Sequence, residues 1–323
     1  MKASVQFRTY KRTLKHPFHS AHGLLEQRSG ILLRLEREDG KLGFGEIAPL
    51  DFFHTESFLE AMGYCDWMPS SHEAYFLEKI PESLKCVRYG FESAWRMMNR
   101  GDELLPEFSV CSLITNRKKL IDKGIFKVKV GKGLFADECA EIERLLSDLP
   151  HGSSIRLDAN EGWDDASAER WFRFLVPYSE KIQYVEQPCP RGKEAFMGHL
   201  QEKYGIPVAL DESVACEEEL ERVLDQGWNG FYVIKPAVWG SLAKLEMLLK
   251  EVQGKVVFSS SLETAIGLWP LLDLARGTSL PLGVDTSYLF DDDMGWDIHG
   301  GKLDRNVFQL DTYKRIWTHI GSC

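Results

Sequence analysis

The sequence lacks paired cysteines. Its seven cysteines are odd in number, scattered along the chain and never spaced as Cys-x-x-Cys. This distribution is typical of reduced thiols in a cytosolic protein, and it argues against a disulfide framework or a zinc cage. The cysteines are Cys65, Cys86, Cys111, Cys139, Cys189, Cys216 and Cys323.

Long hydrophobic runs are also missing. No apolar stretch reaches the roughly 18 residues that a membrane-spanning helix needs, and residues 1–18 contain no apolar run of signal-peptide length. We therefore expect a soluble, cytoplasmic protein that does not contact a membrane.

An excess of positive charge is absent as well. The chain has 39 lysines and arginines against 49 acidic residues, a net charge of −10. This balance argues against binding to nucleic acid or to an anionic membrane surface. An anionic small-molecule substrate would therefore need a local positive centre, supplied by lysines or by a bound metal ion.

A repeating rhythm begins at about residue 108, where short apolar runs alternate with helix-like segments. The alternation predicts an α/β fold, a parallel sheet closed into a (β/α)₈ TIM-type barrel. A doubly wound open sheet is the alternative. The predicted strands are 108–114, 126–130, 153–159, 182–188, 206–212, 230–236, 255–261 and 280–286.

The first hundred residues have a different pattern. Strand-like alternation is followed by a hairpin signal and then by a helical segment. We expect an α+β domain over 1–102, the barrel over 103–290, and a tail over 291–323 that returns toward the first domain.

Polar residues recur near the carboxyl end of the predicted strands, about one βα unit apart. Because these ends share one face of a barrel, residues far apart in the sequence would converge on one pocket. They are Lys129, Asp158, Glu186, Asp211, Lys235, Ser261 and Asp285.

Three of these residues are acids on successive strands. Asp158, Glu186 and Asp211 could meet at one point, and carboxylates without a histidine suit a hard cation such as Mg²⁺, for which Mn²⁺ could substitute. Zinc fits less well because Cys189 has no histidine partner at ligand spacing. Salt bridges among barrel-end side chains are the structural alternative.

Two lysines share one side of the strand at 126–130. Alone, Lys127 and Lys129 would suit a solvated edge strand. With Lys235 across the barrel they suggest acid/base chemistry, because burial and nearby cations lower a lysine pKa from about 10.4 toward about 7 to 8. Lys127 and a metal ion would keep Lys129 deprotonated. Such a pair could abstract a proton α to a metal-bound carboxylate and pass through an enediolate.

The chain resembles the muconate-lactonizing-enzyme-like subgroup of the enolase superfamily. The matching motifs occur in the family's order and at its strand spacing, and they cover nearly the whole chain. They are PFHSAHG (17–23), GFGEIAPL (43–50), KVK (127–129), RLDAN (156–160), VEQP (185–188), LDES (210–213), VIKP (233–236) and SSSLET (259–264).

The resemblance implies a metal shell at the barrel mouth. By similarity Asp158, Glu186 and Asp211 are the ligands of Mg²⁺, and Asn160 and Glu212 support them. It also implies a first domain that caps the barrel, with loops around 19–23 and 49–55 that close the pocket and select the substrate.

The resemblance also implies a reaction. Within the subgroup, the hairpin at 43–50 and the segment 258–268 indicate a dehydratase of menaquinone biosynthesis, which converts a cyclohexadiene carboxylate into an aromatic ring. By similarity Lys129 removes the α-proton and then protonates the departing hydroxyl, while Lys235 stays cationic. Lys127 would contact the substrate carboxylate.

A second polar group of the substrate could bind at the end of the seventh predicted strand. Ser259, Ser260 and Ser261 offer hydroxyls and backbone N–H groups for a second carboxylate or a carbonyl, here the succinyl side chain. Serine-rich βα turns are also common without such a role.

Other functions remain open at this point. An N-acylamino-acid racemase or a dipeptide epimerase of the same superfamily would use the same two lysines. Dipeptide epimerases usually carry a second acid two positions after Asp285, and Ser287 stands there instead. A barrel that only binds a small anion or a protein partner is the alternative outside enzymes.

Overall fold

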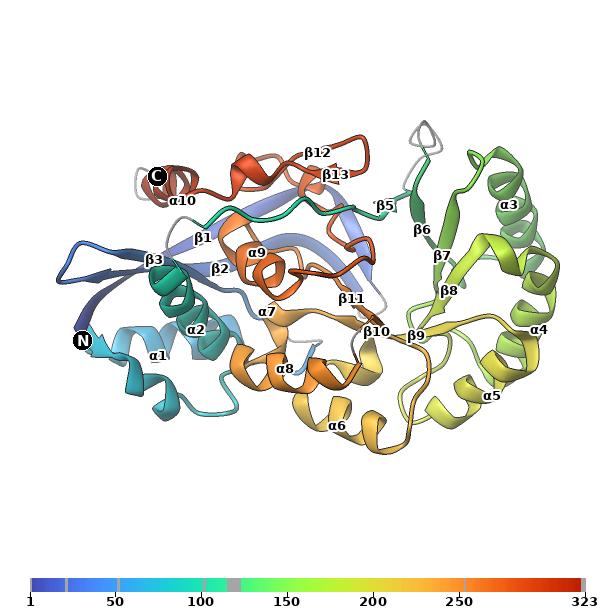
Figure 1. Cartoon of the computed structure of the whole chain (residues 1–323), viewed down its shortest axis with the longest axis horizontal. Coiled ribbons are helices and arrows are strands. Elements are labelled where there is room, and N and C mark those ends of the chain that lie inside the picture. Colours follow the sequence, from blue (N-terminus) through green and yellow to red (C-terminus); the bar gives the residue numbers. More distant parts are fainter. Residues whose placement is uncertain are drawn as a thin grey trace.

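The computed structural model describes residues 2–20, 23–50, 53–100, 103–114, 123–252 and 254–320. A sheet of long antiparallel strands occupies one side of the molecule, and parallel strands surrounded by helices occupy the other (Figure 1). The antiparallel region consists of β1 (Lys2–Ser20), β2 (Gly23–Arg37), β3 (Leu42–Ile47), α1 (Phe58–Trp67), β4 (Ser71–Glu73) and α2 (Lys85–Arg100).

The antiparallel sheet has the strand order β3-β2-β1-β4. Helix α2 packs on β3 so closely that a Cβ atom on Gly43 or Gly45 would lie 2.0 Å from a backbone oxygen of the helix. Because side chains alternate along a strand, Phe44 and Glu46 point to the opposite face. In the sequence GFGE, the two glycines thus give α2 a flat surface to pack on, and Phe44 and Glu46 face away from the helix.

The parallel sheet has the order β11-β10-β9-β8-β7-β6-β5, which is the reverse of the chain order. Its strands are β5 (Ser112–Leu113), β6 (Ile125–Lys129), β7 (Ser154–Asp158), β8 (Ile182–Glu186), β9 (Val208–Leu210), β10 (Phe231–Ile234) and β11 (Val256–Phe258). The helices of the barrel are α3 (Phe135–Asp148), α4 (Asp165–Leu175), α5 (Glu194–Tyr204), α6 (Glu217–Asp225), α7 (Pro236–Trp239), α8 (Leu242–Leu249) and α9 (Ala265–Leu274).

The strand predicted at 280–286 is wrong as a regular strand. This segment forms two isolated parallel bridges, one between Gly283 and Ser259 and one between Leu282 and Val110. Pro281 has no N–H to donate to a ladder, which limits regular pairing here. The two bridges still join β11 to the segment before β5, so the predicted barrel is confirmed and the doubly wound alternative is wrong.

The C-terminal segment packs on the antiparallel sheet. It contains β12 (Ile298–His299), β13 (Lys302–Leu303) and α10 (Leu310–Ile320). The ring of Phe44 lies 6.2 Å from the rings of both Tyr313 and Trp317, measured between centroids, and the guanidinium of Arg8 lies 4.5 Å from the Trp317 ring. The face of β3 opposite α2 therefore contacts this final helix.

Buried side chains form two large hydrophobic clusters. One lies between the antiparallel sheet and α1 and α2, and the other fills the barrel and the space between its strands and helices. The cysteines in the described part of the chain have free thiols. Cys323 lies outside the described residues.

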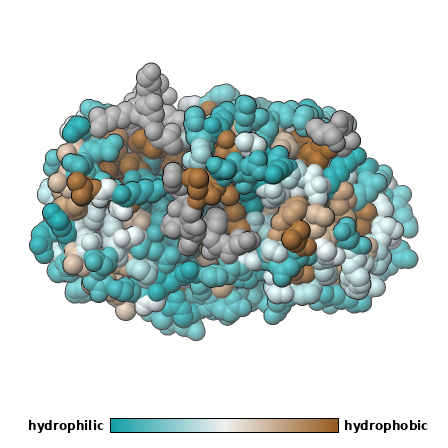
Figure 2. Space-filling model, turned by 180° about the vertical axis from the view of Figure 1, so that it is seen from behind, coloured by the Kyte–Doolittle hydropathy of each residue, from teal (hydrophilic) through white to brown (hydrophobic). Residues whose placement is uncertain are grey.

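One face of the molecule is mostly polar. The face in Figure 2 is largely hydrophilic, with hydrophobic side chains in separate small patches. Across the described residues, none of the helices has the length and apolar character needed to cross a bilayer. Short 3₁₀ helices complete the fold at Ala74–Lys79, Val176–Lys181, Glu212–Val214, Lys250–Val252, Ser287–Leu289 and Arg305–Val307.

Candidate active site

A cavity of about 130 Å³ opens at the carboxyl ends of the barrel strands. Strand β6 contributes Lys127 and Lys129, whose side chains both line it, whereas Phe126 and Val130 are buried on the other side of the strand. The predicted placement of the two lysines on one face is therefore confirmed. Lys235, at the end of β10, also lines the cavity.

The three predicted acids lie on β7, β8 and directly after β9, the strands that separate β6 from β10. Asp158 and Glu186 are register partners on neighbouring strands. The ammonium nitrogen of Lys127 lies 2.8 Å from Asp158 Oδ2 and 2.7 Å from Glu186 Oε1. The ammonium of Lys235 donates to both carboxylate oxygens of Asp211. The barrel therefore brings all three acids and all three lysines together.

Burial shifts the pKa values of two glutamates in this region. It raises the pKa of Glu186 to about 7, and the negative charges of Asp158 and Asp211 add to the rise although Lys127 opposes it. Burial also raises the pKa of Glu212, to about 7. These buried carboxylates therefore favour any added positive charge near them.

The pKa values of the two lysines on β6 are shifted in opposite directions. Burial would lower the pKa of Lys127, but the charges of Asp158, Glu186 and Asp211 outweigh it and raise that pKa well above its usual value. Burial lowers the pKa of Lys129, and the ammonium of Lys127 lowers it further against the opposing charge of Asp158. Of the two lysines on β6, Lys129 is therefore the better base.

The donor atoms fit a hard divalent cation. Besides the three acids, Asn160 Oδ1 and Glu212 Oε2 are buried without a hydrogen-bond partner among the described residues. Asn160 Nδ2 lies 3.4 Å from Glu212 Oε1, and the backbone of Asn160 has a left-handed φ of 45°. An all-oxygen set of this kind is the preference of Mg²⁺.

The carboxylates are directed to lysines rather than to a common centre. In the part of the chain that the structure describes, no three His, Cys, Asp or Glu side chains lie together in a metal-holding arrangement. Lys127 bridges Asp158 and Glu186, and Lys235 neutralises Asp211. The assignment of these three acids as metal ligands therefore stays a prediction.

The predicted serines form one wall of the cavity. The Ser259 hydroxyl donates to the Gly283 carbonyl oxygen at 3.1 Å, and the Ser260 and Thr286 hydroxyls lie 2.8 Å apart. Ser261 donates both its N–H and its hydroxyl to Glu263 Oε2, at 2.5 and 3.1 Å. Their proposed contact with substrate stays a prediction.

An apolar wall was not predicted residue by residue. Leu25, Leu50 and Phe53 reach the cavity from the antiparallel domain, and the Phe53 ring centroid lies 4.6 Å from Lys235 Nζ. The two phenylalanines that follow the 43–50 motif, at positions 52 and 53, were a usable signal. Of the two predicted closing loops, residues 21–22 and 51–52 lie outside the described residues.

Glu263 gives the site a pH-dependent stability. It is buried, and burial raises its pKa from 4.5 to about 7. Between these values the folded chain binds the proton more tightly than the unfolded chain, so this group's contribution to the free energy of unfolding falls as pH rises. We expect the free energy of unfolding in urea of the unchanged chain to fall, relative to that of Glu263→Gln, by on the order of 3 kcal/mol as the pH rises from 4.5 to 8. Parallel pH curves for the two proteins would contradict this.

Comparison with known proteins places the chain among enzymes of one family. Residues 117–253 match the family model described as "Enolase C-terminal domain-like". The o-succinylbenzoate synthase of Thermosynechococcus vestitus is 38% identical over 98% of both chains. That of Pectobacterium atrosepticum is 32% identical over 78% of this chain and 79% of its own length.

The chain belongs to the o-succinylbenzoate synthase family, within the enolase superfamily.

Solved structures agree with this family membership. The crystal structure of the o-succinylbenzoate synthase from Thermosynechococcus elongatus BP-1, complexed with Mg in the active site, superposes with a TM-score of 0.83. It is 32% identical and covers 98% of this chain and 99% of its own. The L-Ala-D/L-Glu epimerase from Bacillus subtilis shares the fold, with a TM-score of 0.78 over 94% and 96% of the chains, at 19% identity.

Ser287 does not take part in the cavity of this family member. Its hydroxyl accepts a hydrogen bond from the Trp296 N–H at 2.9 Å, and it is not among the lining residues. The preceding Asp285 does line the cavity, and its Oδ2 accepts the Leu113 N–H at 2.9 Å. The position that a dipeptide epimerase would use for a second acid is thus bonded to the backbone.

Proposed function

We propose that the chain catalyses the dehydration of 2-succinyl-6-hydroxy-2,4-cyclohexadiene-1-carboxylate (SHCHC) to 2-succinylbenzoate, the o-succinylbenzoate synthase reaction of menaquinone biosynthesis. The observation that carries the proposal is the placement of Lys129 and Lys235 on strands β6 and β10 of one cavity, with buried carboxylates from the three intervening strands between them. The family membership supports the choice of substrate.

The proposed metal site consists of Asp158, Glu186 and Asp211, supported by Asn160 and Glu212. When bound there, Mg²⁺ would supply a Lewis acid for the negative charge that develops on the substrate carboxylate. The buried all-oxygen donor set supports this, as does the Mg in the active site of the Thermosynechococcus synthase.

Lys129 is proposed as both base and acid. Its neutral amine, favoured by burial, takes the proton from the ring carbon that bears the carboxylate. The resulting ammonium then gives that proton to the departing hydroxyl on the same face of the ring, and water leaves. One residue thus performs both transfers, and the net change is the loss of one water molecule.

Lys235 and Lys127 are proposed to stay protonated. Burial would lower the pKa of Lys235, but the charge of Asp211 outweighs it and raises that pKa. A fixed ammonium there balances the charge that forms when the proton is removed. Lys127, already paired with Asp158 and Glu186, would contact the substrate carboxylate.

The walls would orient the substrate. Leu25, Leu50 and Phe53 offer apolar surface to the ring, and the serines at 259–261 offer hydroxyls to the succinyl carboxylate. We assign residues 1–102 to a capping domain, 103–290 to the catalytic barrel and 291–323 to the tail. The free thiols support a cytoplasmic location.

An assay with SHCHC tests the function. The purified chain with Mg²⁺ should form the aromatic product, and EDTA should prevent this. Absence of product with every divalent metal would overturn the proposal. As a control in D₂O, an N-acylamino acid should keep its α-hydrogen, because exchange of that hydrogen marks a racemase.

A further inference from the structure

Arg12 is a buried arginine that lies between two other buried side chains on the same face of its strand, Tyr10 and Leu14. Along β1, Tyr10, Arg12 and Leu14 are buried, whereas Lys11 and Thr13 are exposed, as the period of two requires. Arg12 is 1% exposed and does not line the cavity. A charge at such a position is costly unless every donor is satisfied, so its partners indicate what it does.

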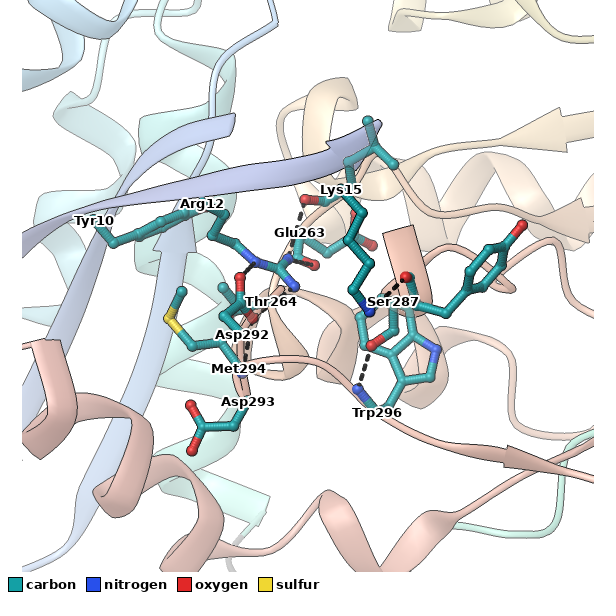
Figure 3. Close-up of polar contacts among 12 residues, drawn as sticks. Tyr10, Arg12, Lys15, Glu263, Thr264, Ser287, Asp292, Asp293, Met294 and Trp296 are labelled. Atoms are coloured by element: carbon teal, nitrogen blue, oxygen red, sulfur yellow. Dashed lines mark hydrogen bonds and ion pairs between the residues drawn. The ribbon is translucent and has the colours of Figure 1, made fainter. Parts of the chain in front are cut away.

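The partners of Arg12 come from two distant segments. Its Nε and Nη2 donate to the two carboxylate oxygens of Asp292, at 2.8 and 3.1 Å. Its Nη1 donates to the carbonyl oxygen of Glu263 at 2.8 Å and approaches that of Leu262 at 3.5 Å. Figure 3 shows the side chain extending from β1 between these two segments. The guanidinium also lies 3.7 Å from the centroid of the Phe290 ring.

The segment that Arg12 contacts is the continuation of the serine wall. Leu262 has a left-handed φ of 68°, a strained conformation for a residue other than glycine, and its side chain lines the cavity. The next residue, Glu263, turns its carboxylate back to Ser261 and accepts both the N–H and the hydroxyl of that serine. The orientation of Ser261 therefore depends on where the backbone at 262–263 is held.

The segment after the barrel completes the arrangement. Asp292 Oδ1 also accepts the Met294 N–H at 3.0 Å, and the Met294 carbonyl accepts the N–H of Ala265, the first residue of α9, at 2.8 Å. One carboxylate thus orients the guanidinium and a turn that is itself bonded to the start of α9.

We propose that Arg12 is a positioning residue for substrate binding. Its guanidinium, oriented by Asp292, holds the carbonyls of Leu262 and Glu263 and thereby sets the serine wall at 259–261. The kinetic part of this inference rests on the proposed function, because the wall is assigned there to the succinyl carboxylate. A strand of the capping domain would thus determine affinity without touching the substrate.

The test compares two arginines that join the first hundred residues to the barrel. Arg96 on α2 pairs with Asp273 at 2.5 Å and with Glu246 at 2.8 Å, and none of these three residues lines the cavity. Arg12→Met should raise KM for SHCHC about tenfold with a smaller change in kcat, whereas Arg96→Met should leave KM within about twofold. If the unchanged chain converts SHCHC and Arg12→Met has the same KM, the inference would be overturned.

Hydrogen exchange provides a readout that needs no turnover. In Arg12→Met, amides in a peptide spanning 259–268 should exchange about tenfold faster than in the unchanged chain, and in Arg96→Met they should not. If the unchanged chain does not convert SHCHC, the proposed function fails, while this comparison still decides the role of Arg12. Equal exchange in the two variants would overturn that role.

A double variant separates the loop contact from the ion pair. Arg12→Met with Asp292→Asn leaves no unpaired buried charge and keeps an acceptor oxygen for the Met294 N–H, so it avoids the main reason for the single variant to misfold. The carbonyls at 262–263 still lack their donor, and KM should stay about tenfold raised. Recovery of the original KM would mean that only the ion pair matters, and the inference would be wrong.

Discussion

Replacing Lys129 with alanine is expected to lower kcat for SHCHC by about 10⁴-fold or more, because one general acid/base typically contributes 10²–10⁴-fold and this lysine is assigned two proton transfers. Lys129 lies in the cavity, and burial disfavours its ammonium form. The remaining lysines cannot replace it, since Lys127 and Lys235 are ion-paired to the acids. Formation of the aromatic product in a steady-state assay measures the effect.

Lys132→Ala is the matched control for this loss. Lys132 follows the same strand but is exposed and outside the cavity lining, so its removal should change kcat by no more than about twofold. Binding of Mg²⁺, measured by titration calorimetry, should persist in Lys129→Ala. Turnover of the alanine variant within tenfold of the unchanged chain would exclude Lys129 as the base.

Removal of divalent cations is expected to lower turnover by about 10³-fold or more, with recovery on addition of Mg²⁺. The reason lies in the buried carboxylates, because burial raises the pKa values of both Glu186 and Glu212 to about 7 and so favours a nearby cation. Glu186→Gln keeps the shape of the side chain and removes one anionic donor, so it should weaken Mg²⁺ binding and lower activity together. Calorimetry and the product assay measure the two effects separately.

Glu56→Gln is the control for a buried carboxylate outside the site. Glu56 accepts the N–H groups of Cys86 and Val87, at 3.1 and 2.7 Å, at the start of α2 and does not line the cavity. Its substitution should leave the Mg²⁺ affinity unchanged, even where it reduces stability. Turnover that resists EDTA and is insensitive to Glu186→Gln would contradict the metal assignment.

The strand-end residues were predictable because their positions follow from one repeating rule. A period of two on β6 places Lys127 and Lys129 together, and the βα repeat returns the chain to the same face at Asp158, Glu186 and Asp211. Both placements follow from the order of residues along the chain.

Other features depend on contacts that no local pattern contains. The ion pairs of Lys127 and Lys235 follow from side-chain packing at the barrel mouth. The apolar wall comes from β2 and from the segment after β3, whose contact with the barrel is not encoded in strand spacing. The strand at 280–286 was overestimated because its hydrophobic residues outweighed the effect of Pro281 in the pattern. Arg12 was not singled out from the sequence, because its partners lie about 250 to 280 residues further along the chain.

The pairing of Arg12 with Asp292 also has a consequence for how the chain folds during its synthesis on the ribosome. The two residues are 280 positions apart. At translation rates of about 5 to 20 residues per second, Arg12 is made roughly 15 to 60 seconds before its carboxylate exists. Strand β1 must therefore remain available, with an unpaired arginine on its inward face, until nearly the entire barrel has emerged. The serine wall is among the last parts of a newly made molecule that can take its final form.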